Sequence, residues 1–366
     1  MVKEETGTEN SQEEIQPIRP EPITANFEVV AFDKKMDIQL ALDALSEGYS
    51  VLITDYYSTG LAVLDALKKH LKKKHVGKSF QQQREFRSAF REVSHKILLK
   101  VKKHKLSVKK SPDLGWFKIL YPELEEFLLP FTQVQGLNSA WQWYQKGMEI
   151  PVLKRKIHPW FGTYFPTRFD HLGIFDHWLQ HYKGDKKSAI DVGIGSGVLA
   201  YQMLNYGFEK IYGTDINPNT IIGLKEDADK NKLNEKLELI HGDLFSGLDL
   251  KTELIVFNPP WLPGSYKLEG MDQAVYYDKN LFPSFFNEVI KYLKPEGKLV
   301  LLFSNLAQIT GLTEEHPIKK ELEEGDRFRK EYFVQKKVQA ASRKTKRNQH
   351  WRDSEMVELW VLRLKE

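Results

Sequence analysis

The first candidate for chemistry in this sequence is Asn258-Pro-Pro-Trp261, which follows the apolar run LIVF at residues 254–257. Two consecutive prolines cannot extend a strand ladder, because proline has no backbone N–H and a fixed φ. The chain must therefore leave its sheet at Asn258, carrying an amide, the rigid carbonyls of Pro259 and Pro260, and the flat ring of Trp261. We expect these groups at the carboxyl end of a strand, where open α/β sheets bind ligands.

A glycine-rich turn is the second candidate. In KSAIDVGIGSGVLAYQML an apolar strand runs into Gly193, Gly195 and Gly197, and a helical pattern follows. Glycine lets the backbone approach a ligand and adopt unusual φ and ψ angles. The dinucleotide pattern G-x-G-x-x-G is not met, because Val198 occupies its sixth position. Asp191 precedes the turn, where its carboxylate could hold a cationic group.

Acidic residues end the next two expected strands. The run KIYGTDIN ends in Asp215, eighteen positions after Gly197, and LELIHGDLF ends in Asp243. An acid at that distance from a glycine turn binds ribose hydroxyls in nucleotide folds. Asp215 could instead be only a helix N-cap before INPNT. The order and spacing of these signals together favour a site that binds a cofactor.

The elements that must position these residues suggest two domains. Residues 1–25 lack apolar periodicity, which predicts a disordered tail. Short strands at NFEVVAF and YSVLITDYY flank a helical pattern, so residues 26–155 are expected to begin as α/β and continue as a smaller, mainly helical domain. Apolar runs alternate with helical patterns in residues 156–366, which is typical of βαβ units.

Positive charge is concentrated in the N-terminal domain. Between Lys68 and Lys110 sixteen Lys and Arg accompany two Glu, a formal charge of +14, whereas the whole chain carries +4. Phe86, Phe90, Val93, Ile97 and Val101 recur at helical spacing, which predicts a basic amphipathic helix. This surface could bind RNA or DNA, or it could be only a solvated face.

Composition excludes several classes of site. The 366 residues contain no cysteine, which excludes disulfides, thiolate metal sites and cysteine nucleophiles. The eleven histidines show no metal-ligand spacing, so we expect no metal. No stretch has the apolar length of a membrane span or the form of a signal peptide, so we expect no membrane contact and a cytoplasmic protein.

These motifs, in this order, resemble the class I S-adenosylmethionine-dependent methyltransferases. The resemblance is to the "small domain" N-methyltransferases with an Asn-Pro-Pro-aromatic motif, such as the release-factor glutamine and rRNA guanine-N2 methyltransferases. It extends from about residue 160 to the C-terminus. It implies a Rossmann-like seven-stranded sheet whose last strand, EMVELWVLRL, is antiparallel. The family's aromatic residue is usually tyrosine or phenylalanine, and tryptophan here widens the stacking face.

The resemblance also implies roles for individual residues. Asp215 would bind the ribose of S-adenosylmethionine, Asp243 and Leu244 would meet the adenine, and Pro166 and Arg168 would lead a helix over the cofactor. The residues assigned to the cofactor are Arg168, Asp191, Gly193, Gly195, Gly197, Asp215, Ile216, Asp243 and Leu244. The assigned catalytic residues are Asn258, Pro259, Pro260 and Trp261.

The expected activity is methyl transfer to an exocyclic amino or amide nitrogen. The Asn258 oxygen and the Pro259 carbonyl would accept hydrogen bonds from the NH₂ group and stabilise its developing charge. Trp261 would stack on a planar substrate, which is worth about 1–3 kcal/mol for a nucleobase. The substrate could be a base of rRNA, tRNA or DNA, or a protein glutamine. The alternatives are a non-catalytic RNA-binding protein that retains the cofactor fold, and a small-molecule methyltransferase.

Overall fold

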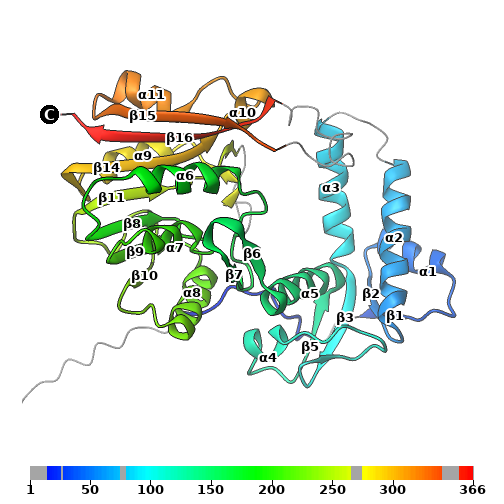
Figure 1. Cartoon of the computed structure of the whole chain (residues 1–366). Helices are drawn as coiled ribbons and strands as arrows, with labels where there is room; N and C mark the ends of the chain where they lie inside the picture. Colours follow the sequence, from blue (N-terminus) through cyan, green and yellow to red (C-terminus); the bar gives the residue numbers. More distant parts are fainter. Residues whose placement is uncertain (1–14, 26–27, 75–79, 265–273, 340–353, 366) are drawn as a thin grey trace, which may run out of the picture. The chain divides into compact units, whose positions relative to one another are not determined.

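The computed structural model describes residues 15–25, 28–74, 80–264, 274–339 and 354–365, and these form two compact units (Figure 1). Unit 1 comprises Glu149–Lys156, Gly162–Glu366 and the described residues up to Ile18. Unit 2 comprises Arg19–Met148 and Ile157–Phe161. The domain boundary expected at residue 155 lies in the stretch where the chain passes between the units. That stretch contains β6 (Met148–Ile150), the 3-10 helix η1 (Pro151–Leu153) and β7 (Arg155–Ile157).

Unit 2 has a five-stranded sheet among its described residues, and helices account for more of those residues than strands do. β1, β2 and β3 are parallel, and β4 and β5 each pair antiparallel with β3. The strands are β1 (Val29–Phe32), β2 (Ser50–Ile53), β3 (Ile97–Lys102), β4 (Lys105–Leu106) and β5 (Glu126–Pro130). The helices are α1 (Ile38–Glu47), α2 (Tyr57–Lys74), α3 (Phe80–Ser94), α4 (Trp116–Leu120) and α5 (Phe131–Lys146).

The prediction of a basic helix across Lys68–Lys110 is wrong. The described cations of this stretch lie at the end of α2, in α3, in the β3–β4 hairpin and in the segments beside them, and residues 75–79 of the stretch lie outside the described residues. The helical spacing fails after Ser94 because Ile97, Leu98 and Leu99 are consecutive and all buried. A continuous apolar run fits a strand that is covered on both faces better than one face of a helix. The positive charge therefore belongs to several elements of one folded unit.

Part of the predicted N-terminal tail is ordered. Ile23 forms a β-bridge with Leu128 of unit 2. Within unit 1, Ile18 N–H donates to the side-chain oxygen of Asn219 at 2.8 Å, and the Asn219 amide donates back to the Ile18 carbonyl at 2.7 Å. The Asn219 side chain thus forms the same pair of hydrogen bonds with the Ile18 backbone that a neighbouring strand would form. Residues 1–14 of the predicted tail lie outside the described residues.

Unit 1 is built on a mixed sheet whose described strands number seven, in the order β10-β9-β8-β11-β14-β16-β15. β16 pairs antiparallel with both β14 and β15, while β8 to β11 and β14 run parallel. The strands are β8 (Ser188–Val192), β9 (Lys210–Asp215), β10 (Leu237–His241), β11 (Thr252–Phe257), β14 (Leu293–Ser304), β15 (Phe328–Lys337) and β16 (Met356–Leu364). The expected mixed α/β class is confirmed.

The central strands are buried because helices cover them. Every residue of β11 is buried, as expected for a parallel strand with both faces covered. The aromatic residues of α9 pack into a core with Phe245, Phe257 and Phe303, and Figure 1 shows α6 lying across the strands. The helices are α6 (Asp170–His181), α7 (Val198–Asn205), α8 (Pro218–Asn231), α9 (Leu281–Val289), α10 (Leu306–Ile309) and α11 (Pro317–Lys320), followed by the π-helical turn η3 (Glu321–Gly325). β12 (Leu262–Pro263) and β13 (Tyr276–Tyr277) pair beside the sheet. Among the described residues, no helix is both long enough and apolar enough to span a membrane.

Candidate functional site

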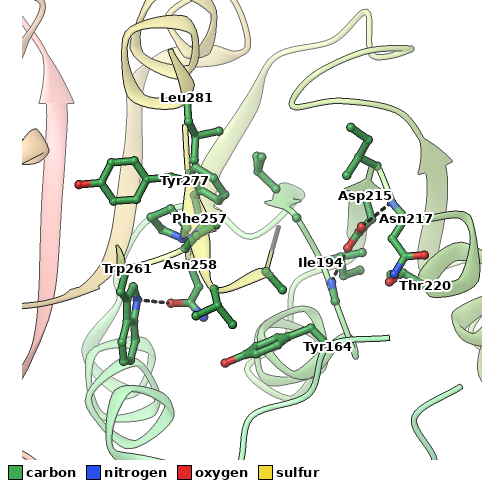
Figure 2. A pocket seen from close by; sticks show the side chains of 18 of the residues that line it. Tyr164, Ile194, Asp215, Asn217, Thr220, Phe257, Asn258, Trp261, Tyr277 and Leu281 are labelled. Carbon is green, nitrogen blue, oxygen red and sulfur yellow. Dashed lines mark hydrogen bonds between the residues drawn. The ribbon is translucent and has the colours of Figure 1, made fainter. Parts of the chain in front are cut away.

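A cavity of about 640 Å³ lies at the carboxyl ends of β8, β9, β10 and β11 in unit 1. Its size is within the range of small-molecule sites. Figure 2 shows Asp215 and Asn217 on one side of this cavity and Asn258 and Trp261 on the other. Two groups of residues that are more than forty positions apart in the sequence therefore face the same space. The parallel strands place them there, because their carboxyl ends share one edge of the sheet.

The glycine turn between β8 and α7 contributes Gly193 and Gly195 to the cavity. Gly193, Gly195 and Gly197 have φ angles of +62°, +52° and +75°, in the left-handed region that favours glycine. A Cβ atom on Gly195 would lie 3.3 Å from the Tyr164 carbonyl oxygen. Gly197 has a different role, since its Cβ would lie 2.9 Å from Leu224 and it does not line the cavity. Gly197 therefore allows α7 to pack closely.

Asp215 ends β9 and braces the glycine turn. Its Oδ2 accepts a hydrogen bond from Gly195 N at 2.9 Å, and its Oδ1 accepts one from Asn217 N at 2.8 Å. Burial raises the pKa of Asp215, and the hydrogen bonds from Asn217 and Gly195 oppose that rise. The side chain of Thr220 also hydrogen-bonds to this carboxylate, and the remaining acceptor capacity is open to a ligand hydroxyl. The next residue, Ile216, lines the cavity with 51% of its surface exposed, although it is apolar.

The loop after β10 brings Asp243 and Leu244 to the cavity. Leu244 has a φ of +45°, which costs a residue other than glycine about 1–2 kcal/mol. The buried hydroxyl of Thr214 donates to the Leu244 carbonyl at 2.6 Å and helps to hold this conformation. Strained backbone of this kind is often found where a loop is shaped for a ligand.

Asp191 and Arg168 do not line the cavity, although both were expected to bind the cofactor. Asp191 is 1% exposed, and its Oδ2 accepts a hydrogen bond from Ala200 N at 2.9 Å. Burial raises the pKa of Asp191 well above its usual value. The carboxylate therefore holds the first turn of α7 rather than a cationic ligand.

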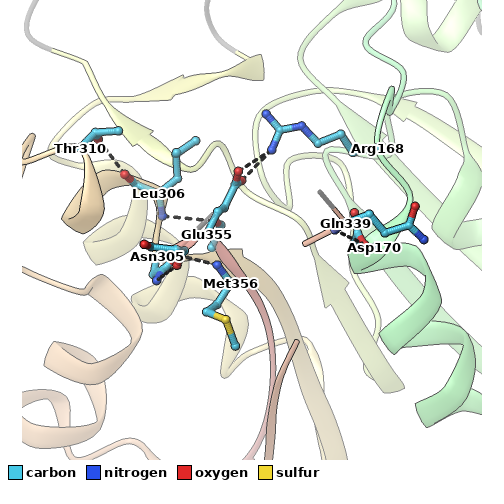
Figure 3. Close-up of polar contacts among 10 residues, drawn as sticks. Arg168, Asp170, Asn305, Leu306, Thr310, Gln339, Glu355 and Met356 are labelled. Atoms are coloured by element: carbon cyan, nitrogen blue, oxygen red, sulfur yellow. Dashed lines mark hydrogen bonds and ion pairs between the residues drawn. The ribbon is translucent and has the colours of Figure 1, made fainter. Parts of the chain in front are cut away.

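Arg168 forms an ion pair instead. Its Nη1 donates to both carboxylate oxygens of Glu355 at 2.7 Å, and the Glu355 side chain is fully buried. Figure 3 shows the two side chains meeting in front of β16. Pro166, two residues earlier, does line the cavity. Arg168 thus anchors the segment before α6 to the start of β16.

Asn258, Pro259, Pro260 and Trp261 all line the cavity, directly after β11. The Trp261 indole N–H donates a hydrogen bond to the Asn258 side-chain oxygen at 3.2 Å, which Figure 2 shows. The indole therefore contacts the amide that the sequence singled out. This contact was not foreseen, and it depends on the indole N–H of tryptophan, which a phenylalanine ring lacks.

His171 is a cavity residue that the sequence analysis missed. It belongs to the first turn of α6, is 3% exposed, and packs edge-to-face against Trp261 with ring centroids 5.5 Å apart. Burial lowers the pKa of His171 to about 4, so its ring is neutral at pH 7. Its Nδ1 is buried and has no hydrogen-bond partner among the described residues. The helix α6 contains three histidines, and nothing in the sequence distinguishes His171 from His177 and His181 as a cavity residue.

The lining beyond Trp261 combines aromatic and apolar residues with polar ones. Tyr276, Tyr277, Leu281 and Leu306 line the cavity there, and so do Asp278, Asn280 and Ser284. Among the described residues, no lysine or arginine lines any part of the cavity. The lining therefore offers aromatic surface to a planar group and disfavours an anion.

Comparison with known proteins gives a family. The family described as ribosomal protein L11 methyltransferase (PrmA) matches residues 174–259. A protein of Methanocaldococcus jannaschii that carries the name protein N5-glutamine methyltransferase is 30% identical over 166 residues, which is 43% of this chain and 80% of that protein. The ribosomal protein L11 methyltransferase of Lachnospira eligens is 40% identical over 74 residues, 20% of this chain and 23% of the relative.

A solved structure is also similar. The ribosomal protein L11 methylase of Lactobacillus delbrueckii subsp. bulgaricus has a TM-score of 0.35 and 17% identity, over 52% of this chain and 78% of the other. The family assignment depends on the sequence match that covers four-fifths of the archaeal relative. The chain is an enzyme that belongs to the class I S-adenosylmethionine-dependent methyltransferases.

Proposed function

We propose that this enzyme transfers a methyl group from S-adenosylmethionine to an amide or exocyclic amino nitrogen. The observation that carries the proposal is that one cavity holds both Asp215, beside the glycine turn, and Asn258, beside Trp261. Asp215 and the glycine turn suit a nucleoside cofactor. Asn258 and Trp261 suit a planar NH₂ group, so the cofactor and the acceptor would meet in one cavity.

The residues around Asp215 fit the cofactor. Asp215 presents a carboxylate to ribose hydroxyls, and Ile216 offers exposed apolar surface beside it for a flat ring. Asp243 and Leu244 complete that end of the cavity, and the missing Cβ atoms of the glycine turn leave room for close approach. When bound, S-adenosylmethionine supplies an electrophilic methyl group on a positively charged sulfur.

The residues around Asn258 would prepare the acceptor. The Asn258 oxygen keeps one lone pair besides the one that Trp261 occupies, and with the Pro259 carbonyl it can accept hydrogen bonds from an NH₂ group. These acceptors stabilise positive charge on the nitrogen as it develops. The absence of cationic side chains from the described lining favours a neutral group.

We propose the side-chain amide of a protein glutamine as the first substrate class. The N5-glutamine methyltransferase of M. jannaschii supports it, because the match covers most of that protein. A base of RNA or DNA is the second class, and the cations of unit 2 favour it. Lys72 and Lys73 on α2 and Lys103 in the β3–β4 hairpin are exposed, whereas Lys100 and Lys102 pair with Glu126.

Labelling a cell lysate separates these classes. Lysate from cells that lack the gene would be incubated with the enzyme and methyl-labelled S-adenosylmethionine, then treated with protease or with nuclease. Label that protease releases supports glutamine, and label that nuclease releases supports a base. Asn258→Ala should lower kcat by about a hundred- to a thousandfold and leave S-adenosylmethionine affinity unchanged, since its contact forms with the acceptor. A stable Asn258→Ala enzyme with full activity would refute the proposed site.

A further inference from the structure

The hydrogen bond between Trp261 and Asn258 determines which way the Asn258 amide faces. An indole N–H can only donate, so it pairs with the amide oxygen and not with the amide NH₂. If the amide turned over, two donors would face each other and the bond would be lost. Trp261 therefore selects the orientation in which an oxygen, with a lone pair to spare, lies beside the cavity.

His171 holds the indole in turn. Its ring lies at 89° to the Trp261 ring, and 97% of its surface is buried. The helix α6 fixes its backbone, so the imidazole forms a rigid wall beside the indole. Its unpartnered Nδ1 is a cost to stability, because a buried polar atom without a hydrogen bond is unfavourable. A purely structural position would be better filled by an apolar ring.

We infer that Trp261 and His171 are positioning residues that orient the Asn258 amide for its acceptor. This inference rests on the proposed function for its kinetic consequence, but the contact itself exists without any ligand. It differs from a stacking role, because stacking needs only the ring of Trp261. A stacking platform would work as well with phenylalanine, whereas the orienting role requires the indole N–H.

The contact can be tested in the free enzyme by the hydrogen exchange of the indole N–H groups, observed by NMR after ¹⁵N-tryptophan labelling. The Trp261→Phe spectrum identifies the Trp261 signal, and free N-acetyltryptophanamide gives the reference for an unprotected indole. Exchange at Trp261 should be at least tenfold slower than in that reference compound. Asn258→Ala should remove that difference, while Asn258→Asp, which keeps an acceptor, should preserve it.

Kinetics test the consequence. Trp261→Phe should lower kcat about tenfold, the loss expected for one hydrogen bond, while KM changes less than threefold. Trp261→Ala should raise KM as well. His171→Ala should lower kcat severalfold and speed the exchange of the Trp261 indole, because it removes the ring that packs against the indole, and Trp143→Phe should match the parent.

Two results would overturn the inference. One is a kcat of Trp261→Phe equal to that of the parent, which would show that Trp261 acts only by stacking. The other is Trp261 exchange that is unaffected by Asn258→Ala. Failure of methyl transfer in every assay would count against the proposed function, whereas the exchange measurement would still decide whether Trp261 orients Asn258.

Discussion

Replacing Asp215 by asparagine should weaken both cofactor binding and the glycine turn. The two carboxylate oxygens accept hydrogen bonds from Gly195 N and Asn217 N. An asparagine has one acceptor oxygen, so its NH₂ group must face one of these N–H donors. One backbone donor then loses its partner, which costs about 1–3 kcal/mol when the group is buried. For a domain of this size we expect the melting temperature to fall by roughly 2–10 °C.

Asp215→Asn should also weaken the binding of S-adenosylmethionine, by an amount that the loss of protein stability does not explain. In the proposed site Asp215 also accepts hydrogen bonds from ribose hydroxyls, and hydrogen bonds to a charged group are worth about 1.5–3 kcal/mol. Asp215→Asn should therefore raise the Kd for S-adenosylmethionine by about ten- to a hundredfold. Isothermal titration calorimetry measures this, beside a melting curve. Asp249→Asn, an exposed position outside the cavity, is the matched control.

The two measurements refute different statements. An unchanged Kd in a folded Asp215→Asn protein would remove this carboxylate from the cofactor site. An unchanged melting temperature would show that the turn around Gly195 does not depend on the second acceptor oxygen of Asp215. A loss of affinity without a loss of stability would leave the ribose contact as the sole role of Asp215.

Three further outcomes are expected. Arg168→Ala should lower the free energy of unfolding by about 2–4 kcal/mol, because it leaves the buried Glu355 carboxylate without its cation, and calorimetric S-adenosylmethionine affinity in the folded variant should change little. Burial holds the pKa of His171 near 4, so the unfolded chain takes up its proton first as pH falls. Between about pH 6.5 and pH 4 the free energy of unfolding of the parent should fall by on the order of 3 kcal/mol more than that of His171→Phe. Denaturant titrations that show equal falls in the two proteins would contradict this. Replacing Lys72 and Lys73 by Gln should reduce the salt dependence of RNA or DNA binding by about one slope unit per lost phosphate contact, and filter binding that shows no such dependence in the parent would favour a solvated face.

The sequence predicted those parts of the site that depend on local chain chemistry. Prolines at 259 and 260 end β11, and glycines at 193 and 195 form the turn after β8, whatever the rest of the chain does. Both signals therefore identify cavity residues. Ile216, which follows the acid at the end of β9, also lines the cavity.

The sequence could not predict contacts between residues that are far apart in the chain and meet only in the folded structure. Arg168 pairs with a glutamate 187 positions away, and no local pattern distinguishes that partner from a ligand. Asp191 looked accessible, yet the first turn of α7 folds back and covers it. The spacing that continued a helix through Ile97 was fortuitous, because Ile97 belongs to β3, a buried strand that pairs with β2 and β5.

The paired hydrogen bonds between Ile18 and Asn219 bear on how the protein can be shortened. The composition of residues 1–25 suggests that a shortened chain could begin at residue 26. That change would remove both hydrogen-bond partners of the Asn219 side-chain amide, and Asn219 is only 1% exposed. Asn219 lies in the first turn of α8, between Pro218 and the cavity residue Thr220. Proteolysis that removes the first two dozen residues should thus loosen the start of α8 and the side of the cavity that Thr220 lines, even though the cut is about two hundred positions away.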